Sequence, residues 1–231
     1  MFDASQPGAP LALDGVWLTL PSAAGPVEIL RGLDFSVEAG ERVAVVGPSG
    51  SGKTSLLALL AGLAAPTAGQ VLVDQVPVVP GQVPPGVATV LQGHGLVSLL
   101  TAAENIEVAL FAAGLAPGRA AAAAQEALAS LGLAEHAGQL ADELSGGQQQ
   151  RVAVARALAT EPAVLIADEP TAEQDSASRE LVLSRMLGLA EVGSSLVLAT
   201  HDPEVAQRCD RVVDLADLRS GSVHRPGLAS G

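Results

Sequence analysis

Lysine, cysteine and positive charge are all scarce in this 231-residue chain. Its 12 Lys and Arg residues stand against 25 Asp and Glu residues, which gives a formal net charge of −13. Non-specific binding to nucleic acid needs clustered basic residues, so this balance argues against a nucleic-acid partner. The chain's one cysteine, Cys209, cannot form an internal disulfide, which is typical of a protein in a reducing compartment. We expect Cys209 to be a small core side chain and not a nucleophile.

Long apolar runs are also missing. No run approaches the roughly 18 to 20 residues that a transmembrane helix needs. The acidic, proline-containing N-terminus does not have the pattern of a signal peptide. We therefore expect a cytoplasmic protein whose contact with a membrane depends on a partner. The chain length predicts one domain, or one domain with an additional lobe.

Residues 42–60 read RVAVVGPSGSGKTSLLALL and predict a strand, a glycine-rich loop and a helix. The glycines let backbone N–H groups turn toward a phosphate, and the helix N-terminus offers a positive dipole end. Lys53 can reach the β- and γ-phosphates of a nucleotide, and the Thr54 hydroxyl can bind Mg²⁺. Lys53 is the chain's one lysine, and its compact charge suits phosphate. The loop has the spacing GxxxxGK[ST] and consists of Gly47, Pro48, Ser49, Gly50, Ser51, Gly52, Lys53 and Thr54.

The remaining pattern predicts an α/β fold. Two strands, 11–20 and 27–37, should form an antiparallel pair that flanks the strand before the phosphate loop. Further strands alternate with helices, which predicts a mainly parallel sheet. We place these strands at 70–74, 87–91, 163–167, 196–200 and 211–215.

Strand signals disappear between residues 93 and about 160. Thr101 and Ser145 each begin a capping box, and each should therefore begin a helix. We expect one domain over 1–231, in which a P-loop NTPase core with an antiparallel β subdomain covers about 11–92 and 161–223. An all-helical subdomain is then inserted over about 93–160.

Two further motifs bear on chemistry. An apolar strand ends in Asp168 and Glu169, and beside the phosphate loop it would direct Asp168 toward Mg²⁺ and Glu169 toward an attacking water. The helix that begins at Ser145 has Gly146 and Gly147 in its first turn, which cost about 1 kcal/mol each relative to Ala. Either another group approaches this backbone closely, as a second phosphate contact would, or the glycine pair is accidental.

In this order, the phosphate loop, Gln92, LSGGQ, Asp168-Glu169, Asp175 and His201 resemble the motifs of ABC transporter ATP-binding subunits. The resemblance covers about residues 11–223. It implies that two such subunits, two copies or two homologues, pair head to tail around two ATP molecules. It further implies that the pair powers an integral-membrane permease, with ATP and Mg²⁺ as the bound groups.

The resemblance also implies a role for each motif residue. Thr54, Gln92 and Asp168 would hold Mg²⁺, and Gln92 would also contact the membrane subunit. Glu169 would polarise the attacking water, and His201 would steady the γ-phosphate. Asp175 belongs to the segment that lies beside nucleotide at the dimer interface. The residues that would grip the partner's nucleotide are Ser145, Gly146, Gly147 and Gln148.

Within the family, the stretches GPSGSGKTSLL, AAENIEVAL and LSGGQQQRVAVARAL most resemble the lipoprotein-releasing and macrolide-efflux type. Gln174 departs from the family pattern, which usually has Leu at this position. Leu20 lies where many members stack an aromatic ring on adenine, and we expect Trp17 nearby to be a core residue. Two alternatives remain open: a regulatory ATPase that acts through a membrane partner, as in cell division, and an ATPase of iron–sulfur assembly.

An apolar cluster follows Gln92. In the resembling family this region forms the groove that receives a helix of the membrane subunit, and the alternative is that the cluster packs inside the helical subdomain. Its members are Leu96, Val97, Leu99 and Leu100.

Overall fold

The computed structural model describes residues 9–23 and 25–219, and within them the strands form two sheets. One is parallel and five-stranded, with the order β6-β7-β8-β3-β9. It consists of β3 (Arg42–Val46), β6 (Val87–Val90), β7 (Val164–Asp168), β8 (Ser195–Ala199) and β9 (Arg211–Asp214). The other sheet is antiparallel and has the order β2-β1-β4-β5. Its strands are β1 (Leu11–Leu20), β2 (Val27–Val37), β4 (Ala68–Val73) and β5 (Val76–Pro77).

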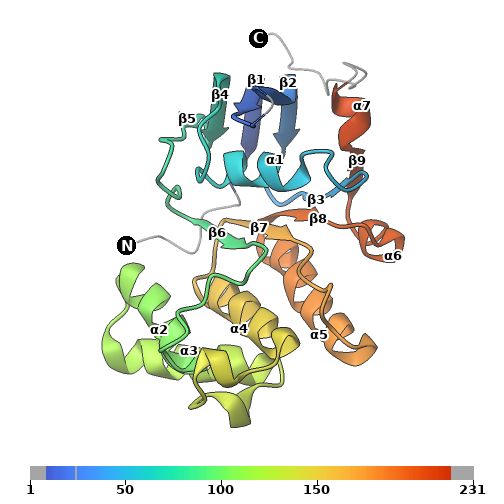
Figure 1. Ribbon diagram of the computed structural model, residues 1–231. Helices are drawn as coiled ribbons and strands as arrows, with labels where there is room; N and C mark the ends of the chain where they lie inside the picture. The colour runs from blue at the N-terminus through green and yellow to red at the C-terminus, as the bar shows by residue number, and fades with distance from the viewer. Residues whose placement is uncertain (1–8, 24, 220–231) are drawn as a thin grey trace.

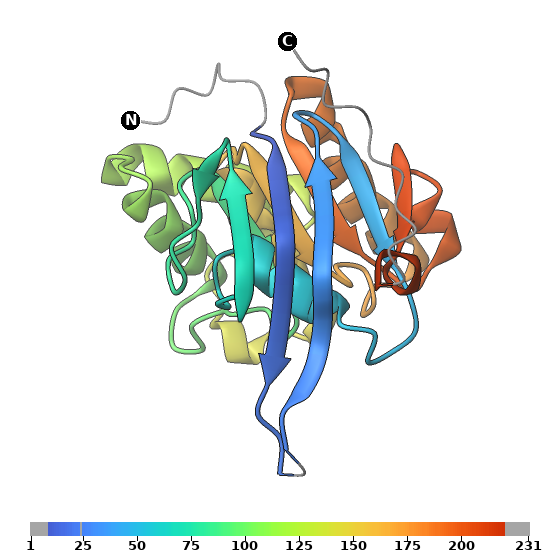
Figure 2. The same cartoon turned by 90° about the horizontal axis from the view of Figure 1, so that it is seen from above.

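Helix α1 (Lys53–Leu60) lies between the two sheets (Figure 1). Figure 2 views the antiparallel sheet from above, with β1 and β2 as the long blue strands. On the opposite side of the parallel sheet lie α4 (Gly146–Ala159) and α5 (Ser176–Leu187), and α2 (Ala102–Ala112) and α3 (Pro117–Ser130) pack against α4. The shorter helices are η1 (Ala134–His136), η2 (Ala141–Glu143), η3 (Gly188–Val192), α6 (Pro203–Ala206) and α7 (Leu215–Arg219).

Strand β7 illustrates how the parallel sheet is built. Its Leu165 and Ala167 belong to one apolar cluster, with α2 to α5, while Val164 and Ile166 belong to another, with α1 and the antiparallel sheet. Successive side chains of a strand point to opposite faces, so both faces must be apolar. This double burial fixes the carboxyl end of β7, where Asp168 lies, between β6 and β8.

The antiparallel pair forms with the predicted bounds, but its predicted place beside the phosphate-loop strand is wrong. Both edges of β3 pair in parallel, with β8 and with β9. No backbone groups of β3 remain for a hairpin, so β1 and β2 join β4 and bury their apolar side chains toward α1. The run after β4 also holds the short edge strand β5, which was not among the predicted strands.

The other predicted strands are present, with ends displaced by no more than two residues. Both predicted capping boxes are confirmed, at Thr101 and at Ser145. Among the described residues, no helix has both the length and the apolarity of a membrane span. The division into a core and a helical subdomain stays a prediction, and its boundary at 223 lies outside the described residues. The helices over 93–160 share their apolar cluster with residues of β6, β7 and β8.

Candidate functional site

The phosphate loop leads from the end of β3 to the first turn of α1. Gly52 is the N-cap of α1 and has a φ of 102°, and a Cβ there would lie 3.0 Å from Ile29 Cγ2. A side chain at this position would therefore be strained by the backbone conformation and crowded against Ile29. Lys53 folds back over the loop, where its Nζ donates to Gly47 O at 2.7 Å and to Pro48 O at 3.2 Å. The loop thus presents an ammonium group beside an uncapped helix N-terminus, which favours an anion.

Thr54 and Asp168 join the loop to strand β7. Thr54 Oγ1 donates to Asp168 Oδ2 at 2.6 Å, and Asp168 is only 3% exposed. Carboxylate and hydroxyl oxygens in this arrangement are the hard ligands that Mg²⁺ prefers.

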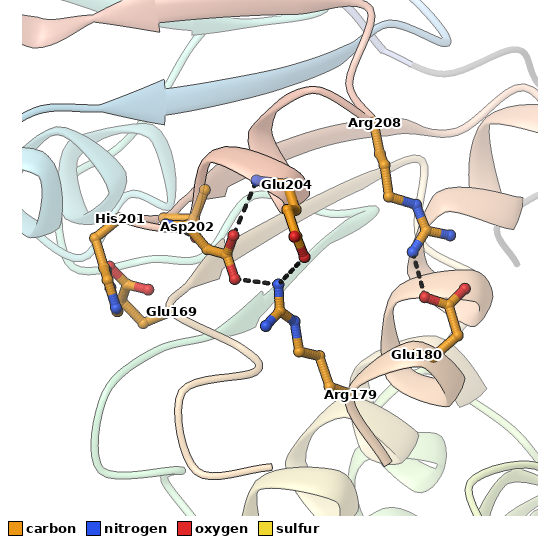
Figure 3. A network of polar contacts seen from close by, with 8 residues as sticks. Glu169, Arg179, Glu180, His201, Asp202, Glu204 and Arg208 are labelled. Carbon is orange, nitrogen blue, oxygen red and sulfur yellow. Dashed lines mark hydrogen bonds and ion pairs between the residues drawn. The ribbon is translucent and has the colours of Figure 1, made fainter. Parts of the chain in front are cut away.

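Glu169 directly follows β7 and has a φ of 49°, which is uncommon for a residue other than glycine. Its backbone is held on both sides: its N–H donates to Ala199 O at 3.0 Å, and its C=O accepts from Gln150 Nε2 at 2.8 Å. This conformation directs the carboxylate toward His201, whose Nδ1 lies 2.8 Å from Glu169 Oε1 (Figure 3). Strained backbone of this kind is concentrated at functional sites.

These groups meet at one cavity of about 410 Å³. Six of the ten lining residues come from the phosphate loop and its continuation into α1, and Asp168 and Glu169 also line the cavity. Its lining consists of Ile29, Ser49, Gly50, Gly52, Lys53, Thr54, Ser55, Gln92, Asp168 and Glu169. Among the predicted loop residues, Gly47, Pro48 and Ser51 do not line the cavity.

Ile29 is a cavity residue that the sequence reasoning missed. It lies on β2, half-buried, beside Glu28 and the exposed Arg31. Neither Leu20 nor Trp17 lines the cavity, and the expectation of a core Trp17 is wrong. Its side chain lies against Gly32, and the residue is 41% exposed.

The helix that begins at Ser145 does not line this cavity. Ser145 Oγ accepts from the Gln148 N–H at 3.3 Å, and Ser145 N donates to Gln148 Oε1 at 2.9 Å. A group does approach Gly146 and Gly147 closely, and it belongs to the same chain. A Cβ at Gly147 would lie 2.7 Å from Glu173 O, and one at Gly146 would overlap with Glu173 Oε2.

Asp175 is also away from the cavity, where it caps α5. Its Oδ1 accepts from the N–H groups of Ala177 and Ser178, both at 3.0 Å. Hydrogen bonding, first of all from the backbone of Ser178, lowers the pKa of Asp175. The carboxylate therefore stays ionised and fixes the first turn of the helix.

Helix α5 is tied to the loop that carries His201. Arg179 forms ion pairs with Asp202 and, at 3.4 Å, with Glu204 (Figure 3). Asp202 in turn caps α6 by accepting from the Glu204 N–H. A second pair, Arg208 Nη1 with Glu180 Oε2 at 2.6 Å, connects the same two segments. Ion pairs at Asp202 and at Arg208 thus hold the segment that carries His201 to α5.

A family model described as "ABC transporter" matches residues 30–172. The chain belongs to this family, and it is an ATP-hydrolysing cassette of the family.

Two relatives show which members of the family the chain is similar to. The chain is 40% identical over 227 residues to "Lipoprotein-releasing system ATP-binding protein LolD 1" of Rhodospirillum rubrum, across 94% of this chain and 98% of the relative. It is 39% identical to "Macrolide export ATP-binding/permease protein MacB 1/2" of Paracoccus denitrificans, across 96% of this chain but 35% of that longer protein.

A solved structure of the ATP-binding cassette MJ0796, a dimer bound to ADP and Pi in a post-hydrolysis state, superposes with a TM-score of 0.82 and 32% identity. The match covers 93% of this chain and 97% of that chain. The expected fold class and the resemblance to the lipoprotein-releasing and macrolide-efflux type are confirmed.

Proposed function

We propose that this chain powers an integral-membrane permease by hydrolysing Mg²⁺-bound ATP, and that two subunits close head to tail around two nucleotides. The gathering of Lys53, the Thr54–Asp168 pair and Glu169 around one cavity carries this proposal. His201 does not line the cavity and contacts it only through its bond with Glu169. Relatives named for lipoprotein release and macrolide export favour transport over the regulatory and iron–sulfur alternatives.

ATP binds through the phosphate loop, residues 47–54. The ammonium of Lys53 exchanges its carbonyl partners, Gly47 O and Pro48 O, for phosphate oxygens, and the free N–H groups at the start of α1 add to the attraction. Local groups must supply this attraction, since the chain as a whole carries a charge of −13.

Mg²⁺ would be held by Thr54, Asp168 and Gln92. The donor set fits, because all three offer oxygen and all three line the cavity. Nowhere in residues 9–23 and 25–219 do three or more His, Cys, Asp or Glu side chains gather as a complete metal site. This agrees with an ion that takes its other ligands from phosphate and water. When bound, it neutralises charge on the β- and γ-phosphates.

Glu169 acts as the base that orients and deprotonates the attacking water. Its backbone is fixed by two hydrogen bonds at the edge of the cavity, and its carboxylate is bonded to the exposed His201. His201 is also free to contact the γ-phosphate, because its side chain is 74% exposed.

The signature residues Ser145, Gly146, Gly147 and Gln148, together with Asp175, serve the nucleotide of the second subunit. Their position away from the chain's own cavity supports this assignment. The dimeric cassette MJ0796 supports it further. Localisation at the inner face of the membrane follows from the permease partner.

The replacement Glu169→Gln tests the catalytic assignment. It should preserve ATP binding and lower turnover roughly 100-fold or more, the scale of a lost positioned base. ATP should then hold the variant as a dimer, which light scattering would detect as a doubled mass. Glu126→Gln is the matched control, since Glu126 is exposed on α3 and does not line the cavity, and it should retain native turnover. Native turnover by Glu169→Gln would refute the assignment.

The permease contact is proposed for the apolar cluster after Gln92. Leu99 is 80% exposed and Val97 is half-exposed, whereas Leu96 packs against the helical core. A charge at Leu99 should therefore abolish recruitment without unfolding the chain. Leu99→Asp should lose co-sedimentation with membrane vesicles of the native cell and keep its basal ATPase rate. Val192→Asp is the control, at a site that is 74% exposed on η3. Equal co-sedimentation of both variants would contradict this surface.

A further inference from the structure

A chain of side-chain amides connects the first turn of α4 to Glu169. Gln174 Nε2 donates to Gly147 O at 2.8 Å and to Gln150 Oε1 at 3.0 Å. Gln150 Nε2 then donates to Glu169 O at 2.8 Å. We name this series, from Gly147 through Gln174 and Gln150 to Glu169, the amide relay.

Gln150 is the centre of the relay. It is only 5% exposed, although amide side chains are mostly found at surfaces. Its Oε1 also accepts from the Glu173 N–H at 3.3 Å, so both ends of this amide are bonded. A buried and fully bonded polar network is rigid and admits one arrangement. Gln150 therefore fixes the segment at 173–174 relative to the backbone of Glu169.

The relay ends at Glu169, the residue whose carboxylate direction matters most for the proposed reaction. Glu169 adopts its left-handed φ of 49° between two backbone hydrogen bonds, and Gln150 supplies one of them. Loss of this bond would let the backbone relax toward a more common conformation. The carboxylate would then turn away from His201, because their contact depends on the backbone direction.

We propose that Gln150 and Gln174 are positioning residues. They make the direction of the Glu169 carboxylate depend on α4, the helix of the same chain that begins with the signature residues. The inference rests on the proposed role of Glu169 as base. In the proposed dimer, the start of α4 contacts the partner's nucleotide, so the relay carries occupancy of one site to the base of the other. An apolar residue at 174 could not donate either hydrogen bond of this link.

Methionine replacements test the relay, since Met resembles Gln in length and shape but forms no comparable hydrogen bonds. Gln150→Met and Gln174→Met should each lower kcat about 10- to 100-fold, the loss expected from a misplacement of about 1 Å. The KM for ATP and the nucleotide affinity should not change, because neither side chain lines the cavity. The double variant should be no slower than the slower single variant, since either break interrupts the same link.

Controls separate positioning from general destabilisation. Thr160→Val removes a side-chain hydrogen bond of 2.8 Å at the far end of α4, and it should keep native kcat. Gln174 is only partly buried, so its variant tests the relay even where Gln150→Met unfolds. Multiplicative losses in the double variant, or a kcat within twofold of native in both singles, would overturn the relay. An inactive Glu169→Gln together with native relay variants would overturn the relay alone, whereas an active Glu169→Gln would overturn the proposed function first.

Discussion

The two signature glycines should respond in opposite ways to a methyl group, although they are neighbours in one helix turn. Gly147 faces backbone: a Cβ there would lie 2.7 Å from Glu173 O. Gly146 faces the end of the Glu173 side chain, which is half-exposed and can rotate away. Gly147→Ala should therefore destabilise the fold, and Gly146→Ala should stabilise it.

The magnitude follows from three contributions. Alanine is favoured over glycine by up to about 1 kcal/mol in a helix, and both variants gain this term. Overpacking against fixed backbone costs about 1 to 3 kcal/mol, and Gly147→Ala alone incurs it. A shift of the segment at 173–174 would also stretch the bond from Gln174 to Gly147 O, which is worth roughly 1 kcal/mol. We expect the free energies of unfolding of the two variants to differ by about 2 kcal/mol or more.

Urea unfolding without nucleotide measures this difference, because no partner then binds the signature helix. Gly146→Ala should shift the midpoint upward and Gly147→Ala downward, with unchanged slopes. Equal stabilisation of both variants would show that the Glu173 backbone leaves room for a Cβ at position 147. Contact with Glu173 would then not explain why glycine is needed there.

Two further predictions concern groups outside the cavity. Burial raises the pKa of the Cys209 thiol to about 11. Iodoacetamide should therefore alkylate it roughly 100-fold more slowly at pH 8 than a free cysteine, and mass spectrometry showing equal rates would refute this. The second concerns Asp210, whose pKa is lowered, chiefly by its side-chain hydrogen bond with Arg42. Because the pKa is lower in the folded state than its unfolded value of about 4, the ionised carboxylate stabilises the fold above about pH 4. This stabilisation is lost as the pH falls below that value and through the folded pKa. Asp210→Asn should thus cost about 0.5 to 1 kcal/mol at pH 7, with a shrinking difference from native below pH 4, and a constant difference would contradict the sign.

Local sequence patterns were sufficient to predict the strands and the residues at which helices begin. Thr101 and Ser145 cap their helices as predicted, because a capping box depends only on residues within one turn. The strands of the parallel sheet were predictable because double burial leaves continuous apolar runs. Cys209 packs partly buried against the helical cluster, as its apolar character suggested.

Long-range placement was not predictable in this way. Strand pattern gave the hairpin of β1 and β2 but not its sheet, since nothing local records that β8 and β9 occupy both edges of β3. Ile29 was missed for the same reason: its contact with Gly52 exists only because β2 crosses near the phosphate loop. Trp17 was wrongly predicted to be buried, because an aromatic residue on a strand does not show which face of the sheet other elements cover.

The glycine pair shows why one sequence signal can have two physical causes. Helix propensity left two explanations for the glycine pair: either a group such as a phosphate approaches the first turn of α4, or the pair is accidental. The structure supplies another one, since Glu173 fills the space that a Cβ at Gly147 would need. In the proposed dimer the first turn of α4 also attracts a phosphate, through its N–H groups and the helix dipole. Together they explain a helix start that is costly in isolation: its small residues let one turn contact the chain's own segment at 173–174 and, in the proposed dimer, the nucleotide of the other subunit.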